Sequence, residues 1–324
     1  MLDIAILTGG PSAEREVSEN SAKLVEKYLS PEKYRSRMIL MEVEGWFDRD
    51  SGQKVDLNDF SLILGNEKIK FDFVFLMIHG SPAEDGKLQG YFEMMGVPHS
   101  TCNTLSSALT FNKQMCKNYL APFDIPLADS VILQKGDTAA DVQLPVPVFV
   151  KPNQNGSSYG VTKVTDRALL QEAIDFAFGY DEEVMVESFI EGREFGCGVI
   201  REGYVTHAFP VTEIIPAAGK AFFDYEAKYL GASQEITPAV LSGDHTLRIQ
   251  ELSKKIYKIL QCRGVVRMDF ILKNNEFYLL EVNTIPGMSE ASIVPQQARA
   301  YGWDIPHLLD VIIKDCISRP KGQM

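Results

Sequence analysis

Apolar and polar positions alternate with two different periods along the first hundred residues. Residues 2–7 are a mostly apolar run that ends at a glycine and proline turn, and a stretch with helical spacing follows. The apolar face of that stretch contains Val17, Leu24, Val25 and Tyr28. Residues 37–41 are a second strand candidate, and residues 73–78 are apolar throughout, as in a strand buried on both faces. Strands that alternate with helices predict a parallel α/β layer for residues 1 to about 100.

Two glycine-containing turns follow strands of this predicted layer. Gly9-Gly10 comes after the first apolar run, and His79-Gly80 comes after the run at residues 73–78. Ligands of parallel α/β sheets bind beyond the carboxyl ends of the strands. We therefore expect both turns to lie near a binding site.

The rest of the chain has a different pattern, typical of an α+β arrangement. Residues 105–120 are helical in spacing, and a small unit follows with strands at 146–151 and 161–164 and a helix at 166–178. From residue 183 the pattern favours strands, at 183–187, 195–200, 205–214, 265–272 and 277–282, with a helix at 245–260 and a polar loop at 224–230. The last helix begins after Asp304 as N-cap, and its predicted buried face is Leu308, Leu309, Ile312, Ile313, Cys316 and Ile317. We expect domains at 1–100, 101–184 and 185–324.

Composition narrows the possible partners. The 324 residues carry a formal net charge of −12, which argues against nucleic acid or an anionic membrane as the main partner. The five cysteines are scattered and form no C-x-x-C pair, as in a protein of a reducing compartment. No apolar stretch approaches the ~18 residues of a spanning helix, and the N-terminus has no basic segment of a signal peptide. We expect a cytoplasmic protein.

The strongest chemical signal is a pair of strands rich in polar side chains. Arg267 and Asp269 are two residues apart, as are Glu281 and Asn283, so each pair shares one face of its strand. A two-residue turn near residues 274–275 would place Asp269 and Glu281 on opposite faces, whereas a longer turn or a β-bulge would align them. Aligned, two carboxylates and an amide oxygen suit Mg²⁺ held together with phosphate. The alternative is a solvated polar face on an ordinary hairpin.

Two further segments are weaker signals of a nucleotide site. Lys151 ends a strand and precedes a glycine- and serine-rich loop at residues 152–160, whose small residues allow backbone N–H groups to approach phosphate, although a plain surface turn also explains it. Glu187 ends another strand before the apolar pair Phe189-Ile190, an arrangement that can hold an adenine ring, and Glu194 follows within reach of a ribose. An ordinary β-bend is the alternative there.

Residues 9–18 contain a turn before a helix, but they lack the G-x-G-x-x-G spacing of a dinucleotide fingerprint. Taken in order, residues 9–18, 79–90, 225–229 and 267–287 resemble the motifs of the D-alanine–D-alanine ligase family of the ATP-grasp superfamily. The resemblance extends from Ile4 to about Leu309 and depends on several separate motifs. It implies an ATP-grasp fold with an N-terminal parallel α/β domain.

The resemblance also implies the ligands and the residues that hold them. The residues assigned to ATP are Lys113, Lys151, Ser158, Glu187, Ser188, Phe189, Ile190, Glu194 and Lys228. Lys113 and Lys151 are expected to hold the phosphates. Asp269, Glu281 and Asn283 are expected to bind two Mg²⁺ ions, for which Mn²⁺ can substitute.

The amino-acid substrates are assigned in the same way. Glu14 is expected to hold the ammonium of the first D-alanine, with His79 nearby, and Ser292 and Ile293 are expected to receive the second. Arg267 and the N–H of Gly287 are expected to stabilise the oxyanion, and Ser157 and Tyr229 to join Glu14 in closing the site. The family also implies a homodimer. It further implies that residues 224–230 form the lid.

Some positions differ from the usual family pattern, and other activities remain possible. Ala83 replaces a common glycine, Met268 a smaller apolar residue, Tyr159 a smaller residue, and Glu290-Ala291 a polar pair before Ser292. The last difference affects the expected second substrate site. A D-alanine–D-lactate ligase, another ATP-grasp carboxylate–amine ligase and a non-catalytic nucleotide-binding protein are the alternatives. Retention of Glu14, His79, Tyr229 and all metal carboxylates argues against them.

Overall fold

The computed structural model describes residues 1–12, 14–156, 159–216 and 233–318. The described strands form three larger sheets and one small hairpin, and the three sheets follow one another along the chain. Among the described helices, none is both long and apolar enough to cross a membrane.

The N-terminal sheet has the strand order β3-β2-β1-β6 and is mixed. Strand β1 (Leu2–Gly9) pairs in parallel with β2 (Tyr34–Glu42) and β6 (Phe73–Leu76), as expected, with helix α1 (Arg15–Tyr28) connecting β1 to β2. The prediction of a purely parallel layer is wrong at one edge, where β3 (Gly45–Asp48) runs antiparallel to β2. Only two residues connect β2 to β3, and such a short connection can join only antiparallel neighbours. Further elements are the hairpin β4 (Ser61–Leu64) and β5 (Glu67–Lys70), and helix α2 (Lys87–Met95).

The middle of the chain begins with two helices where one helical stretch was expected. Helix α3 (Thr104–Phe111) ends before Asn112, whose extended backbone stops it. The Asn112 side chain then accepts a hydrogen bond from the Met115 N–H and caps α4 (Lys113–Leu120). This break places Lys113 in the first turn of α4.

The second sheet is antiparallel and has the order β7-β10-β8-β9. Its strands are β7 (Ser130–Gln134), β8 (Val148–Pro152), β9 (Thr162–Val164) and β10 (Glu183–Ser188), and helix α5 (Leu170–Ala177) packs against it. Strand β7 was not expected from the sequence. Because β8 and β10 pair side by side, Lys151 at the end of β8 lies close to the middle of β10.

The third sheet has the order β14-β13-β11-β15-β16, with β12 paired to β11. Its strands are β11 (Arg193–Glu202), β12 (Val205–Ala208), β13 (Thr212–Pro216), β14 (Ser233–Ile236), β15 (Val266–Lys273) and β16 (Glu276–Asn283). The single strand expected at residues 205–214 is wrong, since β12 and β13 are separate. Pro210 lies between them, and proline cannot donate a backbone hydrogen bond to a ladder.

The hairpin of β15 and β16 has both a tight turn and a β-bulge, which were considered as alternatives for it. Asn274 and Asn275 form a tight turn, both with left-handed backbones (φ 49° and 65°). A register shift between Asp269 and Phe270 then places Asp269 directly opposite Glu281. The bulge therefore aligns the two carboxylates although the turn is short.

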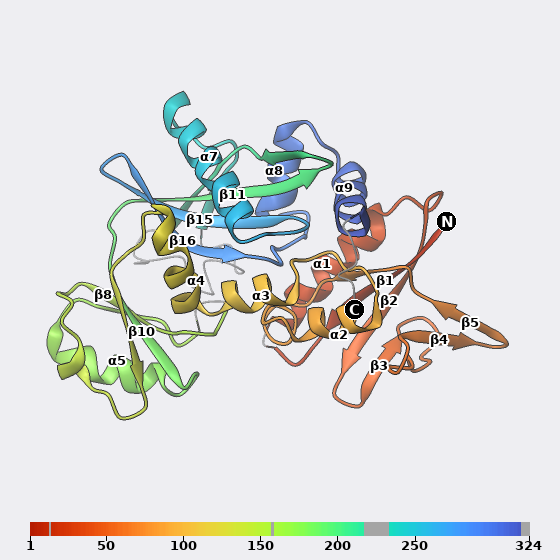
Figure 1. Cartoon of the computed structure of the whole chain (residues 1–324), viewed down its shortest axis with the longest axis horizontal. Coiled ribbons are helices and arrows are strands. Elements are labelled where there is room, and N and C mark those ends of the chain that lie inside the picture. Colours follow the sequence, from red (N-terminus) through yellow and green to blue (C-terminus); the bar gives the residue numbers. More distant parts are fainter. Residues whose placement is uncertain (13, 157–158, 217–232, 319–324) are drawn as a thin grey trace.

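The described residues of the C-terminal part also form helices α7 (Gly243–Ile259), α8 (Ile293–Tyr301) and α9 (Ile305–Ser318). Asp304 accepts a hydrogen bond from the His307 N–H at 2.8 Å, which confirms the predicted N-cap of α9. The expected buried face is confirmed except for Ile317, which is 38% exposed in the last turn of the helix. Side chains of α9 and α1 share one apolar core, so the two ends of the described chain pack together (Figure 1).

Candidate active site

Two neighbouring cavities lie between the sheets. We call the first, of about 370 Å³, the carboxylate cavity, because Glu14, Glu84 and Glu235 line it. We call the second, of about 350 Å³, the lysine cavity, because Lys151 and Glu187 line it and Glu187 carries a pair of lysines. Both are lined by Lys113, Asn155, Gly156 and Glu281. A ligand group in one cavity is therefore close to a ligand group in the other.

The lysine cavity gathers most of the residues expected to hold ATP. Those that line it are Lys113, Lys151, Glu187, Ser188, Phe189, Ile190 and Glu194. They come from α4, from the paired strands β8 and β10, from the segment that follows β10, and from the start of β11. Phe149 packs edge to face on Phe189 with 5.6 Å between ring centroids, so one wall of the cavity is apolar.

A buried triad of charges lies beside this cavity. The Glu187 carboxylate is 5% exposed and binds Lys117 Nζ and Lys151 Nζ, each at 2.6 Å. Burial would raise the pKa of Glu187, but the two lysines lower it below its ordinary value. Lys117 also donates to the Ala128 carbonyl at 2.6 Å, and burial lowers its pKa despite Glu187.

Lys117 was missed in the sequence, although a signal was present. It lies four residues after Lys113, and residues four apart share a helix face. Its side chain is only 13% exposed, which is unusual for a lysine and is explained by its pairing with Glu187.

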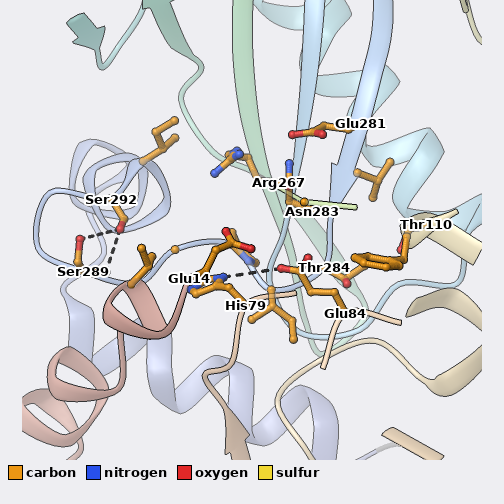
Figure 2. Close-up of a pocket in the computed structure, with 18 of the residues that line it drawn as sticks. Glu14, His79, Glu84, Thr110, Arg267, Glu281, Asn283, Thr284, Ser289 and Ser292 are labelled. Atoms are coloured by element: carbon orange, nitrogen blue, oxygen red, sulfur yellow. Dashed lines mark hydrogen bonds and ion pairs between the residues drawn. The ribbon is translucent and has the colours of Figure 1, made fainter. Parts of the chain in front are cut away.

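The carboxylate cavity gathers the residues expected to act on the amino-acid substrates. Those that line it are Glu14, His79, Arg267, Glu281, Asn283, Gly287, Ser292 and Ile293. Figure 2 shows Glu14, His79 and Glu84 close together on one side, with Arg267, Glu281 and Asn283 across from them. The segments that follow β1 and β6 thus supply one wall, and the β15–β16 hairpin supplies the other.

Glu84 is an acidic residue to which no role was assigned from the sequence. Its carboxylate lies 3.7 Å from His79 Nδ1. Burial raises its pKa, the hydrogen bond to His79 lowers it, and the neighbouring Glu14 raises it, with a net increase. Its position five residues after His79 in the second motif was the signal that could have identified it. Glu235 of β14 also lines this cavity, and burial raises its pKa although Arg267 opposes the shift.

Arg267 and Asp269 confirm the predicted shared face of β15. The Arg267 guanidinium donates to both carboxylate oxygens of Asp269 at 2.8 Å, and Asn283 Nδ2 donates to Asp269 Oδ2 at 2.9 Å. The neighbours expected in the core, namely Val266, Met268, Phe270 and Val282, are buried. The hairpin therefore presents one polar face to the cavities and one apolar face to the core.

The same hairpin was expected to bind metal. Asp269, Glu281 and Asn283 provide two carboxylates and an amide oxygen on that polar face. Within residues 1–12, 14–156, 159–216 and 233–318, no group of three His, Cys, Asp or Glu residues is arranged to hold a metal ion. A bound cation here would thus need oxygen ligands from a phosphate as well.

The loop after β16 shapes the far end of the carboxylate cavity. Ser292 Oγ accepts a hydrogen bond from the Ser289 N–H at 2.9 Å and lies 2.8 Å from Ser289 Oγ. A Cβ at Gly287 would lie 2.9 Å from Ser292 Oγ, so a side chain there would displace the Ser292 hydroxyl. Ser292 precedes α8, whose N-terminus is an electrostatically favourable place for an anion.

Several expected site residues lie outside the described residues. These are Ser157, Ser158, Lys228 and Tyr229, together with the predicted lid at 224–230. Their assigned roles remain predictions.

Comparison with known proteins identifies the relatives of this chain. The model of the D-ala D-ala ligase N-terminus matches residues 3–102, and that of the D-ala D-ala ligase C-terminus matches residues 120–314. The D-alanine–D-alanine ligase of Bacteroides fragilis (strain YCH46) is 44% identical over 321 residues, which cover 97% of this chain and 98% of that protein.

Two solved structures have the same fold. The VanG D-Ala:D-Ser ligase from Enterococcus faecalis is 34% identical with a TM-score of 0.86, covering 96% of this chain and 98% of that one. The D-alanine–D-alanine ligase from Bacillus anthracis complexed with ATP is 28% identical with a TM-score of 0.79, covering 98% of both chains.

Proposed function

The chain belongs to the D-alanine–D-alanine ligase family, and from this premise we propose that it joins two D-alanine molecules at the expense of ATP. The product, D-alanyl-D-alanine, serves peptidoglycan precursor synthesis. The observation that carries the proposal is the meeting of the two cavities at Lys113 and Glu281. A γ-phosphoryl group in the lysine cavity would lie beside a carboxylate in the carboxylate cavity.

ATP occupies the lysine cavity in this proposal. The apolar wall around Phe189 and Ile190 covers the adenine, Glu187 and Ser188 bind its polar edge, and Glu194 binds the ribose. Lys113 and Lys151 hold the phosphates at the end that adjoins the carboxylate cavity. Ser158 and Lys228 complete the set by resemblance alone.

The two D-alanine molecules occupy the carboxylate cavity. Glu14 binds the ammonium of the first, beside His79, while Ser292, Ile293 and the N-terminus of α8 receive the carboxylate of the second. Ser157 and Tyr229 close the site with Glu14. Glu14, His79 and Glu84 line the same cavity, and Glu14 is close enough to Glu84 to raise its pKa, so two acidic side chains there suit an ammonium-bearing substrate.

Mg²⁺ fits the polar face of the hairpin. Asp269 lies opposite Glu281 in the ladder, and Asn283 contacts Asp269, so two carboxylates and an amide lie on one polar face. We propose that these three residues would hold two Mg²⁺ ions, or Mn²⁺ in their place, and that metal binding would replace the contacts that Arg267 now makes with Asp269. When bound, the ions neutralise charge on the transferred phosphoryl group.

The proposed reaction has two steps. In the first step a carboxylate oxygen of the first D-alanine attacks the γ-phosphorus of ATP, the bond to the β–γ bridging oxygen breaks, and ADP and an acyl phosphate form. The amine of the second D-alanine then attacks the acyl carbon, loses a proton, and expels inorganic phosphate. Arg267 and the N–H of Gly287 stabilise the oxyanion of this second step.

ADP release tests the proposal. We expect release with D-alanine and Mg²⁺, together with formation of the dipeptide, and little release with glycine or L-alanine. D-Lactate and D-serine as second substrates test the other members of the superfamily, since a structural relative is a D-Ala:D-Ser ligase. Absence of the dipeptide when D-alanine and ATP are both saturating would overturn the proposal.

We also propose that the protein works in the cytoplasm as a homodimer, as expected for the family. Light scattering of the purified protein tests the dimer, since a mass of one chain, 36.2 kDa, would contradict it.

A further inference from the structure

A buried hydroxyl lies beneath the carboxylate cavity and contacts two of its walls. Ser21 of α1 is 0% exposed, so water has no access to its side chain. Its Oγ lies 3.1 Å from the backbone nitrogen of Met288, the residue after Gly287, and 3.3 Å from Nε2 of His79. The Ser21 side chain therefore contacts both the loop that contains Gly287 and the histidine proposed to lie near the first substrate.

The direction of each hydrogen bond follows from the chemistry of the donors. A backbone N–H can only donate, so Ser21 Oγ accepts from Met288. The hydroxyl hydrogen then needs an acceptor, and within the part of the chain that the structure describes, His79 Nε2 lies 3.3 Å from Ser21 Oγ. If the hydroxyl donates to Nε2, the ring carries its proton on Nδ1, which faces Glu84 at 3.7 Å.

Two other serines bind the backbone of His79. Its N–H donates to Ser18 Oγ at 3.0 Å, and its carbonyl accepts from Ser12 Oγ at 2.8 Å. These contacts fix the position of the residue, but neither touches the ring. Ser21 is the contact from α1 that reaches the ring itself.

We propose that Ser21 is a positioning residue that sets the ring tautomer of His79 and ties that ring to the loop of Gly287. The inference deepens the proposed function and depends on it for its kinetic consequence. If the Ser21 hydroxyl were removed, Met288 and His79 would both lose a buried hydrogen-bond partner that water cannot replace. Formation of the oxyanion site and orientation of the histidine are thus coupled through one hydroxyl.

A shape-matched pair of variants isolates the hydroxyl. Ser21→Thr keeps it and Ser21→Val removes it, while both add the same bulk to the buried site. We expect kcat/KM for D-alanine to be about tenfold lower in S21V than in S21T, the loss typical of one buried hydrogen bond with an unpaired partner. The KM for ATP should not differ, because the lysine cavity does not contact Ser21.

The ring tautomer provides a readout that a purely structural role would not move. Nitrogen-15 NMR of the five histidines, with His79 assigned by a His79→Gln variant, should show Nδ1 protonated and Nε2 unprotonated in the wild type and in S21T. In S21V the Nε2 resonance should move toward that of an imidazole with mixed tautomers. A protonated Nε2 in the wild type, or identical spectra for S21T and S21V, would overturn the inference.

Two further variants keep the test decisive if the added bulk prevents folding. Ser21→Ala removes the hydroxyl without adding volume, and Ser253→Ala removes another fully buried helical hydroxyl, which donates within α7 far from both cavities. S21A should shift the His79 spectrum, whereas S253A should leave it unchanged. Because the spectra need no substrate, they judge the inference even if D-alanine proves not to be the substrate.

Discussion

The lysine cavity and the carboxylate cavity treat buried charge in opposite ways. In the lysine cavity the buried carboxylate of Glu187 is neutralised by two lysines at 2.6 Å. In the carboxylate cavity, Glu84 lies near a second carboxylate, that of Glu14, with His79 as its close basic neighbour. The first cavity is organised before any ligand arrives, whereas the second holds acidic groups that a cationic ligand can neutralise.

The two cavities also differ in how the chain builds them. The lysine cavity is made from residues 113–281, largely from neighbouring antiparallel strands. The carboxylate cavity joins residues near the N-terminus, such as Glu14, to residues near the C-terminus, such as Ser292. Figure 1 shows the corresponding elements, α1 and α8, brought together from opposite ends of the sequence. A nucleotide site built locally thus adjoins a substrate site that requires the whole fold.

Glu281 lines both cavities, so its removal should have the largest effect. We expect Glu281→Gln to lower turnover by at least about 10³-fold with Mg²⁺, because a metal ion that stabilises phosphoryl transfer contributes several kcal/mol. The Kd for ATP should change much less, since the adenine contacts lie elsewhere. Glu276→Gln, at the exposed start of the same strand, is the matched control. Near-normal turnover of E281Q would show that the two cavities do not share a metal site.

Arg267 tests the carboxylate cavity alone. Arg267→Lys keeps the charge but loses the planar fork that now holds both oxygens of Asp269. We expect kcat to fall by about 10²-fold, as for loss of one oxyanion donor. Steady-state kinetics provide the measurement, with the exposed Arg248→Lys as control. A change confined to KM would assign Arg267 to ground-state binding instead.

Lys117 tests the lysine cavity alone. When Lys117 is removed, Lys151 is the remaining lysine of the pair that neutralises Glu187. If Lys151 then binds phosphate, it leaves the buried carboxylate of Glu187 without a lysine, which costs free energy. We expect Lys117→Met to raise the Kd for ATP about tenfold, the size of one lost buried hydrogen bond, with an unchanged KM for D-alanine. Lys135→Met removes a lysine whose side chain is 65% exposed and serves as the control. An unchanged Kd, measured by calorimetry, would mean that Lys117 only supports the fold.

Sequence patterns predicted most of the local elements around both cavities. The apolar runs at residues 73–78 and 265–272 contain strands β6 (Phe73–Leu76) and β15 (Val266–Lys273), because their burial on a sheet is encoded in consecutive residues. The alignment of Asp269 with Glu281 was left open, since a bulge depends on packing across the sheet and not on the turn residues. The antiparallel pairing of β3 and the break at Pro210 were missed for a different reason. The strands involved are short, and short strands have too few residues to show a clear periodicity.

The residues missed at the site share one property. Lys117 binds Glu187, which is 70 positions away in the sequence. Ser21 and Glu84 both contact the buried His79, which is 58 positions from Ser21. The helical spacing from Lys113 does not by itself distinguish Lys117 from a solvated lysine, and nothing adjacent to Ser21 distinguishes it from an ordinary helical serine. Their roles follow from burial, which the linear pattern indicates only for apolar residues.

The smallest expected effects concern stability, and they should have opposite signs in the two cavities. The folded pKa of Glu84 is raised, so ionised Glu84 destabilises the fold at high pH, and this cost disappears as pH falls through the folded pKa towards 4.5. The folded pKa of Glu187 is lowered, so its stabilisation is present above 4.5 and is lost as pH falls through the folded value.

Two isosteric variants test these opposite effects on the free energy of unfolding. At pH 8, Glu84→Gln should raise the free energy of unfolding and Glu187→Gln should lower it, because the first removes a destabilising charge and the second leaves two buried lysines without their carboxylate. As pH falls towards 5, the gain from E84Q should shrink while the loss from E187Q should persist, since the folded pKa of Glu187 lies below 4.5. Denaturant unfolding at both pH values provides the data. A loss of stability in E84Q at pH 8 would mean that the contact of Glu84 with His79 outweighs its burial, and the contrast between the two cavities would then not extend to stability.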